Sequence, residues 1–561
     1  MNLDLEYLGR SGVVESGSGS SLRFSPNLAR PRVAFDAELK KALRFREAIS
    51  ALHEIVVGDL RFKPRDKSAY AAWKQNRSAE EAALRTALMT QAVAVETSAL
   101  SHGLATEEPP ENLDSEFRRL HGIYWHARRA WARELQRDDP ELFRHLVPCD
   151  PVVTVAPDSV FFECFAKDQS SYGCLSVDRE GFQPHEATLG TTNVDYSLAL
   201  FEHFQTLRSY RPTRLLVDPS GFEVQVESRE GHREEKIDLP PSWLRGFGQL
   251  QAAMALPTRT VELSVDAVYS LLAHLKRHRE KTGPRSLRFQ LTPGKPPSIV
   301  LEPWNLTVAS RGPGYEGEQA EEIKVWGRRR LMVLSRVLPL AEKVTVQLLG
   351  SGLPSIWTVH MGELRLTLAL SGWTANDWSA GANLAALGGN FTSDPRCLAQ
   401  LSRHLLTAQL APLSELTHVT EAPRNVVLGS LHQLARQGQV IYDFALQQYR
   451  WRQVMPVALS ESVLGPEPEE LVVGRRLAAE GAVKIVREEQ LTLERRLVMA
   501  EVGALTCEAV LDLDGGLTRA RCGCSYFRKF RLRGGRCRHL VALGLRAVPA
   551  VAAPVTKDWL H

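Results

Sequence analysis

Three cysteines and one histidine near the end of the sequence have the types and the spacing of metal ligands. They form two close pairs, Cys522-x-Cys524 and Cys537-x-His539, with twelve residues between the pairs. Structural zinc sites use four nitrogen or sulfur ligands in a tetrahedron and leave no open position. A Cys-x-Cys disulfide would have awkward geometry and leave His539 unexplained, and a catalytic zinc keeps an open position. The spacing therefore predicts one structural Zn²⁺.

The flanking sequence predicts how the backbone brings these four side chains together. A β-hairpin expected over 507–522 ends at the first pair, where side chains at i and i+2 point to the same face. Helical spacing from Leu540 onward places Cys537 in the turn before a helix and His539 in its first turn, because i and i+2 diverge inside a helix. Two glycines before Cys537 give that turn its backbone freedom.

This pattern resembles the SWIM zinc finger, which occurs in chromatin-remodelling ATPases, plant transposases and many bacterial proteins. All four ligand positions of the family are filled, and the order strand, strand, helix also matches. The resemblance implies that one Zn²⁺ is bound by Cys522, Cys524, Cys537 and His539. It covers residues 503–548 of the 561-residue chain. Segments 326–331 and 371–378, with the winged helix described below, are also similar to a bacterial group of uncharacterised SWIM proteins. The family is credited with DNA binding or protein–protein contact.

The residues between the two ligand pairs combine positive charge with aromatic rings. The basic residues are Arg528, Lys529, Arg531, Arg533 and Arg536, and the aromatic residues are Tyr526, Phe527 and Phe530. Basic groups neutralise phosphates and rings stack on unpaired bases, so nucleic acid, with DNA favoured, is the predicted partner. A solvated basic face that docks on an acidic protein partner is the alternative.

Composition predicts a cytoplasmic globular protein with several domains. A chain of 561 residues is too long for one core, and no apolar run or N-terminal signal pattern predicts a membrane helix or secretion. Its net charge is only +4, but residues 515–546 hold nine lysines or arginines and no acid. Eight cysteines are too few for a disulfide scaffold. Four of them are expected to be small buried residues: Cys149, Cys164, Cys174 and Cys397.

Patterning along the chain predicts a multidomain α+β fold. Residues 1–140 are expected to be mainly helical, with helices over 37–56, 67–104 and 114–137. Residues 141–390 are expected to form a central α+β body, with a duplicated α+β unit as one alternative. Its predicted strands are 152–156, 160–165, 214–218, 222–226, 260–263, 286–291, 298–301, 345–349 and 364–370. Its predicted helices are 196–210, 265–277 and a basic helix over 326–338. Thr374 and Asp377 resemble a capping box that opens a further helix.

Residues 391–456 predict a winged helix-turn-helix. Helices are expected over 397–406, 413–417 and 423–436, followed by a hairpin over 439–452. The third helix of such folds can enter the major groove of DNA. Its polar face and the wing would then offer Arg424, Asn425, His432, Gln433, Arg436, Arg450 and Arg452, while a docking or spacer module is the alternative. A linker at 465–470 precedes a helix and strands within 466–502, and then the 503–548 zinc finger, a ββα unit.

No catalytic constellation is identifiable. The GxGxxG pattern at 312–317 is followed by acidic residues and is framed by no βαβ unit, so a loop is expected. His121 and His126 are expected to be ordinary surface or core histidines. We therefore expect a non-catalytic protein without a small-molecule substrate, although the central body could hide an active site. The alternative to nucleic-acid binding is an adaptor whose finger docks a partner such as a separately encoded ATPase.

Overall fold

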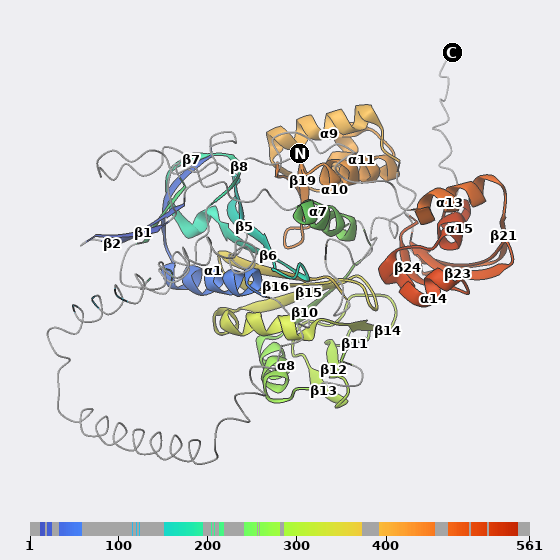
Figure 1. Cartoon of the computed structure of the whole chain (residues 1–561), viewed down its shortest axis with the longest axis horizontal. Coiled ribbons are helices and arrows are strands. Elements are labelled where there is room, and N and C mark those ends of the chain that lie inside the picture. Colours follow the sequence, from blue (N-terminus) through green and yellow to red (C-terminus); the bar gives the residue numbers. More distant parts are fainter. Residues whose placement is uncertain are drawn as a thin grey trace, which may run out of the picture. The chain divides into compact units, whose positions relative to one another are not determined.

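The computed structural model describes residues 12–16, 19–24, 33–58, 151–194, 213–217, 241–254, 258–280, 285–372, 392–454, 469–492, 495–512 and 515–547, with single positions between them. Within these ranges the chain is a mixed α+β protein with five β-sheets (Figure 1). Several predictions fall outside the described residues, apart from single positions. They are the helices at 67–104, 114–137 and 196–210, the strand at 222–226, the capping box, Cys149, His121 and His126.

A strand, a helix and a three-stranded antiparallel meander occur twice in residues 259–370. The first set is β10 (Arg259–Leu263), α8 (Val265–Arg277) and the meander β11, β12, β13 (Leu287–Leu291, Ser298–Leu301, Leu306–Ala309). The second is β14 (Glu321–Val325), the 3₁₀ helix η2 (Arg328–Arg336) and the meander β15, β16, β17 (Lys343–Leu348, Ser355–Met361, Leu364–Leu370). The first strand of each set pairs with the meander of the other set: β10 pairs with β15, and β14 pairs with β11.

The N-terminal part of the body exchanges strands in the same way. There β3 (Ala34–Leu39) and α1 (Ala42–Val56) precede the meander β4, β5, β6 (Val152–Val155, Ser159–Phe165, Ser171–Asp178). The later strand β8 (Gly190–Asn193) pairs with β4, and β3 pairs with β9 (Thr213–Val217). A five-stranded sheet in the order β1-β2-β9-β3-β7 results, with β1 (Gly12–Ser16), β2 (Gly19–Phe24) and β7 (Phe182–Thr188).

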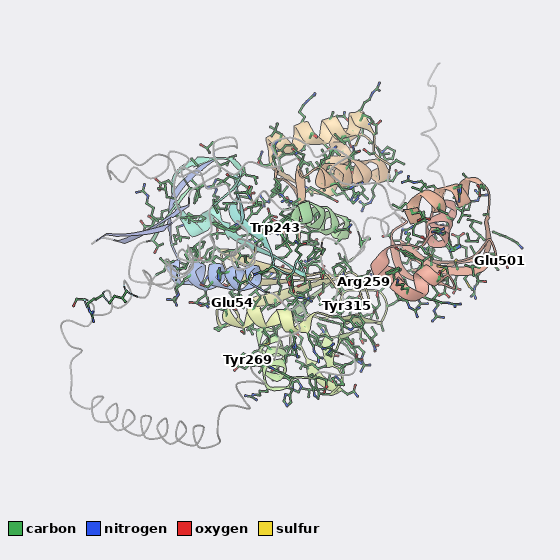
Figure 2. The ribbon with its side chains drawn as sticks, in the orientation of Figure 1. Glu54, Trp243, Arg259, Tyr269, Tyr315 and Glu501 are labelled. Atoms are coloured by element: carbon green, nitrogen blue, oxygen red, sulfur yellow. The ribbon has the colours of Figure 1, made fainter. Side chains whose placement is uncertain are left out.

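Strands β6 and β17 join the two halves into one eight-stranded sheet, in the order β10-β15-β16-β17-β6-β5-β4-β8. Their antiparallel register runs from Leu364 opposite Val177 to Leu370 opposite Ser171. All of β5 and nearly all of β16 are buried, as expected for strands covered on both faces. Helix α1 contacts β5, β6 and β17. Trp243 lies on α7 (Pro241–Met254) (Figure 2). Its ring packs against that of Phe165 of β5, with the ring centroids 5.4 Å apart.

Several predicted elements differ from those observed. The helix expected over 37–56 begins only at Ala42, because residues 34–39 alternate between buried and half-buried positions as a strand does. The basic helix expected over 326–338 is instead η2 followed by a short 3₁₀ turn, η3 (Leu338–Leu340). Gly327, with φ of +87°, precedes η2, and Pro339 lies inside η3, where it has no N–H to donate to a continuing helix. Strand β16 was not predicted.

A three-helix module with its own core spans residues 394–454. It contains α9 (Pro395–Ala408), α10 (Leu413–Thr420) and α11 (Arg424–Arg436), and a sheet in the order β18-β20-β19 (Leu410–Ala411, Gln448–Trp451, Val440–Asp443). The Asp394 carboxylate caps α9 by accepting from the backbone N–H of Cys397 at 2.9 Å. The helices and the hairpin lie where the sequence predicted them.

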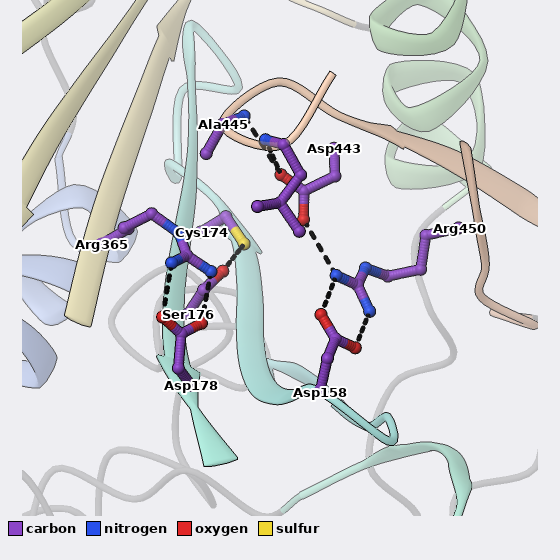
Figure 3. A network of polar contacts seen from close by, with 9 residues as sticks. Asp158, Cys174, Ser176, Asp178, Arg365, Asp443, Ala445 and Arg450 are labelled. Carbon is purple, nitrogen blue, oxygen red and sulfur yellow. Dashed lines mark hydrogen bonds and ion pairs between the residues drawn. The ribbon is translucent and has the colours of Figure 1, made fainter. Parts of the chain in front are cut away.

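Two arginines of this hairpin are buried against the body. Arg450, whose side chain is 1% exposed, donates to both carboxylate oxygens of Asp158 at 2.5 and 2.7 Å and to Asp443 at 3.1 Å (Figure 3). Arg452 is fully buried 3.4 Å from the carboxylate of Glu163, which also accepts from the Tyr172 hydroxyl at 2.6 Å. The expectation that Arg450 and Arg452 face DNA from a wing is therefore wrong: both guanidinium groups are buried in ion pairs with body or hairpin carboxylates.

Replacing Arg452 should destabilise this contact strongly. Burial raises the pKa of Glu163, and the charge of Arg452 and the hydrogen bond from Tyr172 offset only part of this desolvation. Arg452→Met leaves a buried carboxylate without its counter-charge, and we expect a loss of about 3–5 kcal/mol, measured as a lower thermal midpoint. Adding Glu163→Gln should restore much of the loss, whereas the exposed Arg424→Met is the control. Equal midpoints for Arg452→Met and Arg424→Met would contradict this role.

Candidate metal centre

The four predicted ligands lie in a C-terminal module, residues 469–547. It contains α13 (Glu469–Ala479), α14 (Ser525–Phe530), α15 (Arg538–Ala547) and one antiparallel sheet in the order β21-β22-β23-β24 (Val483–Thr492, Arg495–Val502, Leu505–Asp512, Leu517–Cys522). The boundary expected between residues 502 and 503 falls inside this sheet, since β22 and β23 pair along their whole length. The supporting helix and the ligand-bearing segments therefore share one module.

The backbone places Cys522, Cys537 and His539 as the sequence predicted, whereas Cys524 lies beyond the predicted strand, at the start of the unpredicted helix α14. Cys522 is the last residue of β24, and Cys524 caps α14 by accepting from the backbone N–H of Phe527 at 3.3 Å. Cys537 immediately precedes α15, and His539 is the second residue of that helix. Gly535 has φ of +83°, a conformation that favours glycine, and it turns the chain toward Cys537.

The four side chains form one cluster whose ligand atoms all lie within 4.8 Å of one another. The Sγ of Cys522 lies 3.8 Å from the Nδ1 of His539. Zinc–sulfur and zinc–nitrogen bonds of about 2.3 and 2.1 Å would give tetrahedron edges of roughly 3.6–3.8 Å. Hydrogen bonds from the Cys507 and Cys537 thiols lower the pKa of Cys522, whereas burial raises the pKa of Cys524 and the hydrogen bond to Cys522 raises that of Cys537. Binding a metal would require all three thiols to lose their protons. The donor set and its spacing thus fit a metal ion.

Glu470 of α13 holds the backbone between two of the ligands. Its carboxylate accepts from the backbone N–H of Arg538 at 2.6 Å and from the Arg538 guanidinium at 2.5 Å. Burial alone would raise the pKa of Glu470, but these bonds outweigh it and the pKa is lowered. Helices α13 and α15 pack closely, since a Cβ at Gly474 would lie 2.5 Å from Val541. A carboxylate thus orients the helix start that carries His539.

The predicted nucleic-acid residues divide between the surface and the interior. Arg528, Lys529 and Arg531 are exposed, and Tyr526 and Phe530 are half-buried. Phe527 is 2% exposed and belongs to the core, whereas Arg536 is 3% exposed and donates to the carbonyl of Gly515. Burial lowers the pKa of Arg536 to about 10. The side chain of Arg533 lies outside the described part.

One residue of the centre was missed by the sequence analysis. Cys507 is fully buried on β23, directly opposite Cys522 on β24, and the two sulfur atoms are 3.5 Å apart. The spacing pattern gives no sign of it, because it lies 15 positions before the first ligand. The register of the predicted hairpin is the signal that could have placed it beside the ligands. Of the other cysteines, Cys164 and Cys397 are buried as expected and Cys174 is half-buried.

Replacing Glu470 should weaken metal binding without removing a ligand. Partners that orient metal ligands typically contribute about 10–100-fold in affinity, and we expect that loss for Glu470→Gln, measured by competition for Zn²⁺ with a chromophoric chelator. Glu469→Gln is the matched control, because Glu469 is 79% exposed and only flanks Arg538 at 3.3 Å. Identical affinities in the two variants would contradict a positioning role for Glu470.

Comparisons with known proteins add little to this picture. No protein-family model matches the chain, and no curated protein matches it. Proliferating cellular nuclear antigen from Entamoeba histolytica is 14% identical with a TM-score of 0.28, covering 40% of this chain and 89% of its own. The C-terminal region of FEN-1 bound to A. fulgidus PCNA gives 10% identity and a TM-score of 0.26, covering 41% and 91%. Such low scores assign neither fold nor function. No helix among the described residues is long and apolar enough to cross a membrane.

Proposed function

We propose that this chain is a non-catalytic zinc protein of the SWIM type that binds nucleic acid, with DNA favoured, through the surface beside its metal centre. The observation that carries the proposal is the exposed cationic segment between the ligand pairs. Arg528, Lys529 and Arg531 stand on α14 and the turn that follows it, between Cys524 and Cys537. A metal bound at both ends of this segment would hold its charges in place.

Zinc is the metal that the donor set favours. Three thiolates and one imidazole are soft and borderline ligands, and they complete a tetrahedron without an open position. A closed site supplies folding energy rather than catalysis. This agrees with the burial of Cys522 and Cys537, which are 8% and 0% exposed.

The exposed basic surface suits a polyanion. Among the described residues, no carboxylate forms an ion pair with Arg521, Arg528 or Arg531. The ring centroids of Tyr526 and Phe530 are 4.9 Å apart. Both residues are half-buried, so part of each side chain is accessible for stacking on bases. Phe527 and Arg536 are not included in the proposed contacts, because both point into the module.

The three-helix module has the element order of a winged helix-turn-helix, but we give it a minor part in binding. Its third helix, α11, packs against α7 as well as α9. Gln433 bonds to Ser393, and the ring nitrogen Nδ1 of His432 is buried. Arg424 and Arg436 remain exposed, and with the half-buried Asn425 they could add contacts to a nucleic acid already held by the C-terminal module.

The purified chain should contain about one zinc per molecule, as a closed four-ligand site requires. Cys522→Ser combined with Cys537→Ser should lose it, measured by elemental analysis after dialysis against a weak chelator. Cys164→Ser combined with Cys397→Ser removes the same number of thiols elsewhere and should retain the metal. A folded chain without metal would overturn the zinc assignment.

Neutralising the exposed segment should weaken nucleic-acid binding. The triple variant Arg528→Gln, Lys529→Gln, Arg531→Gln should lose about tenfold or more in affinity at low salt and lower the salt-dependence slope by about two to three. Fluorescence anisotropy with single- and double-stranded DNA and RNA measures both quantities.

The matched control changes net charge equally on the same module. It replaces Arg476, Lys484 and Arg487, which are 67%, 80% and 61% exposed and lie near carboxylates. This control should bind nearly as the parent chain does. Equal losses of affinity in both triple variants would show that the effect comes from net charge alone. A parent chain that binds no nucleic acid at low salt would favour the protein adaptor instead.

A further inference from the structure

A fourth sulfur, outside the four predicted ligands, touches the metal centre without being needed as a ligand. Cys507 lies in the third strand of the module's sheet, and its Sγ is 3.5 Å from the Sγ of Cys522. Four ligands already complete the tetrahedron, so Cys507 would keep its proton when a metal is bound.

The strand geometry allows these two cysteines to bond. Cys507 and Cys522 are directly paired residues of the antiparallel strands β23 and β24. Directly opposite residues have Cα atoms about 4.5–5.5 Å apart, within the 4.4–6.8 Å range of disulfides. A small rotation of each side chain would therefore close the gap between the sulfurs without moving the backbone.

We propose that Cys507 is the partner thiol for oxidation of the centre: a peroxide converts Cys507 and Cys522 into a disulfide, which removes one metal ligand. The thiolate of Cys522, 8% exposed, attacks a peroxide oxygen, the O–O bond breaks and a sulfenic acid forms. Cys507, fully buried, then attacks that sulfur, and the S–O bond breaks. One thiolate, one thiol, one hydrogen peroxide and one proton give a disulfide and two water molecules, so the sulfurs are oxidised and the peroxide is reduced.

This modification would couple oxidation to loss of metal. A disulfide sulfur is a poor ligand, so Zn²⁺ would keep only Cys524, Cys537 and His539 and bind less tightly. The inference rests on the proposed zinc site, but the disulfide itself can be scored without metal. Reduction by a dithiol would return both thiols and allow zinc to rebind.

The test treats the zinc-loaded full chain with hydrogen peroxide. Released zinc is followed with a colorimetric chelator, and disulfides are mapped by differential alkylation and peptide mass spectrometry. We expect a Cys507–Cys522 linked peptide to accumulate with zinc release, and dithiothreitol to reverse both. Cys507→Ser should lose the linked peptide and the reversibility of release, whereas the buried and distant Cys397→Ser should behave as the parent chain.

The outcomes separate this inference from the proposed function. A chain that holds zinc but forms its first disulfide between Cys522 and Cys524 or Cys537 would overturn the inference alone. The same result follows if Cys507→Ser releases zinc at the parental rate with full reversal. A purified chain without zinc would contradict the proposed function, and the metal-free chain would still show whether peroxide links Cys507 to Cys522.

Discussion

The pairing of β6 with β17 is the constraint on which the body depends. These strands contribute seven consecutive residue pairs and make one sheet from two strand-exchanged halves. At its edge Arg365 donates to both carboxylate oxygens of Asp178, 187 positions away in the sequence, at 2.6 and 2.7 Å (Figure 3). Without this pairing, β5 and β16 would each lie in a small sheet, and their continuous apolar faces would need other cover. The long-range ladder therefore decides which surfaces are buried.

The C-terminal module is held by a different kind of interaction. Most of β21 is exposed, so the sheet has little core of its own on that side. The packing of α13 on α15, the bonds between Glu470 and Arg538, and the sulfur cluster hold the helices and the ligand-bearing segments of the module together. A metal ion is an effective substitute for apolar burial in so small a unit. A bound metal would also fix the backbone that presents Arg528 and Arg531, so stability and binding would depend on the same four ligands.

Local patterns in the sequence predicted much of this structure. The helix over 265–277 and the strand over 364–370 were predicted with the boundaries observed, because periodicity there is strong. The ligand spacing predicted a cluster whose geometry the structure supports. Local patterns could not predict which residues far apart in the sequence contact one another. Arg450, Arg452 and Arg536 resemble surface residues by type, and only the tertiary fold buries each of them and supplies its partner. Cys507 likewise lies beside the ligand Cys522 only because of the register between β23 and β24.

X-ray absorption at the zinc edge of the purified full chain tests the central claim most directly, because it reports both the metal and its ligands. The account predicts three sulfur neighbours at about 2.3 Å and one nitrogen at about 2.0–2.1 Å. The Cys522→Ser, Cys537→Ser variant should lose this signal. A first shell made only of oxygen and nitrogen, or a folded chain with no zinc edge at all, would contradict it.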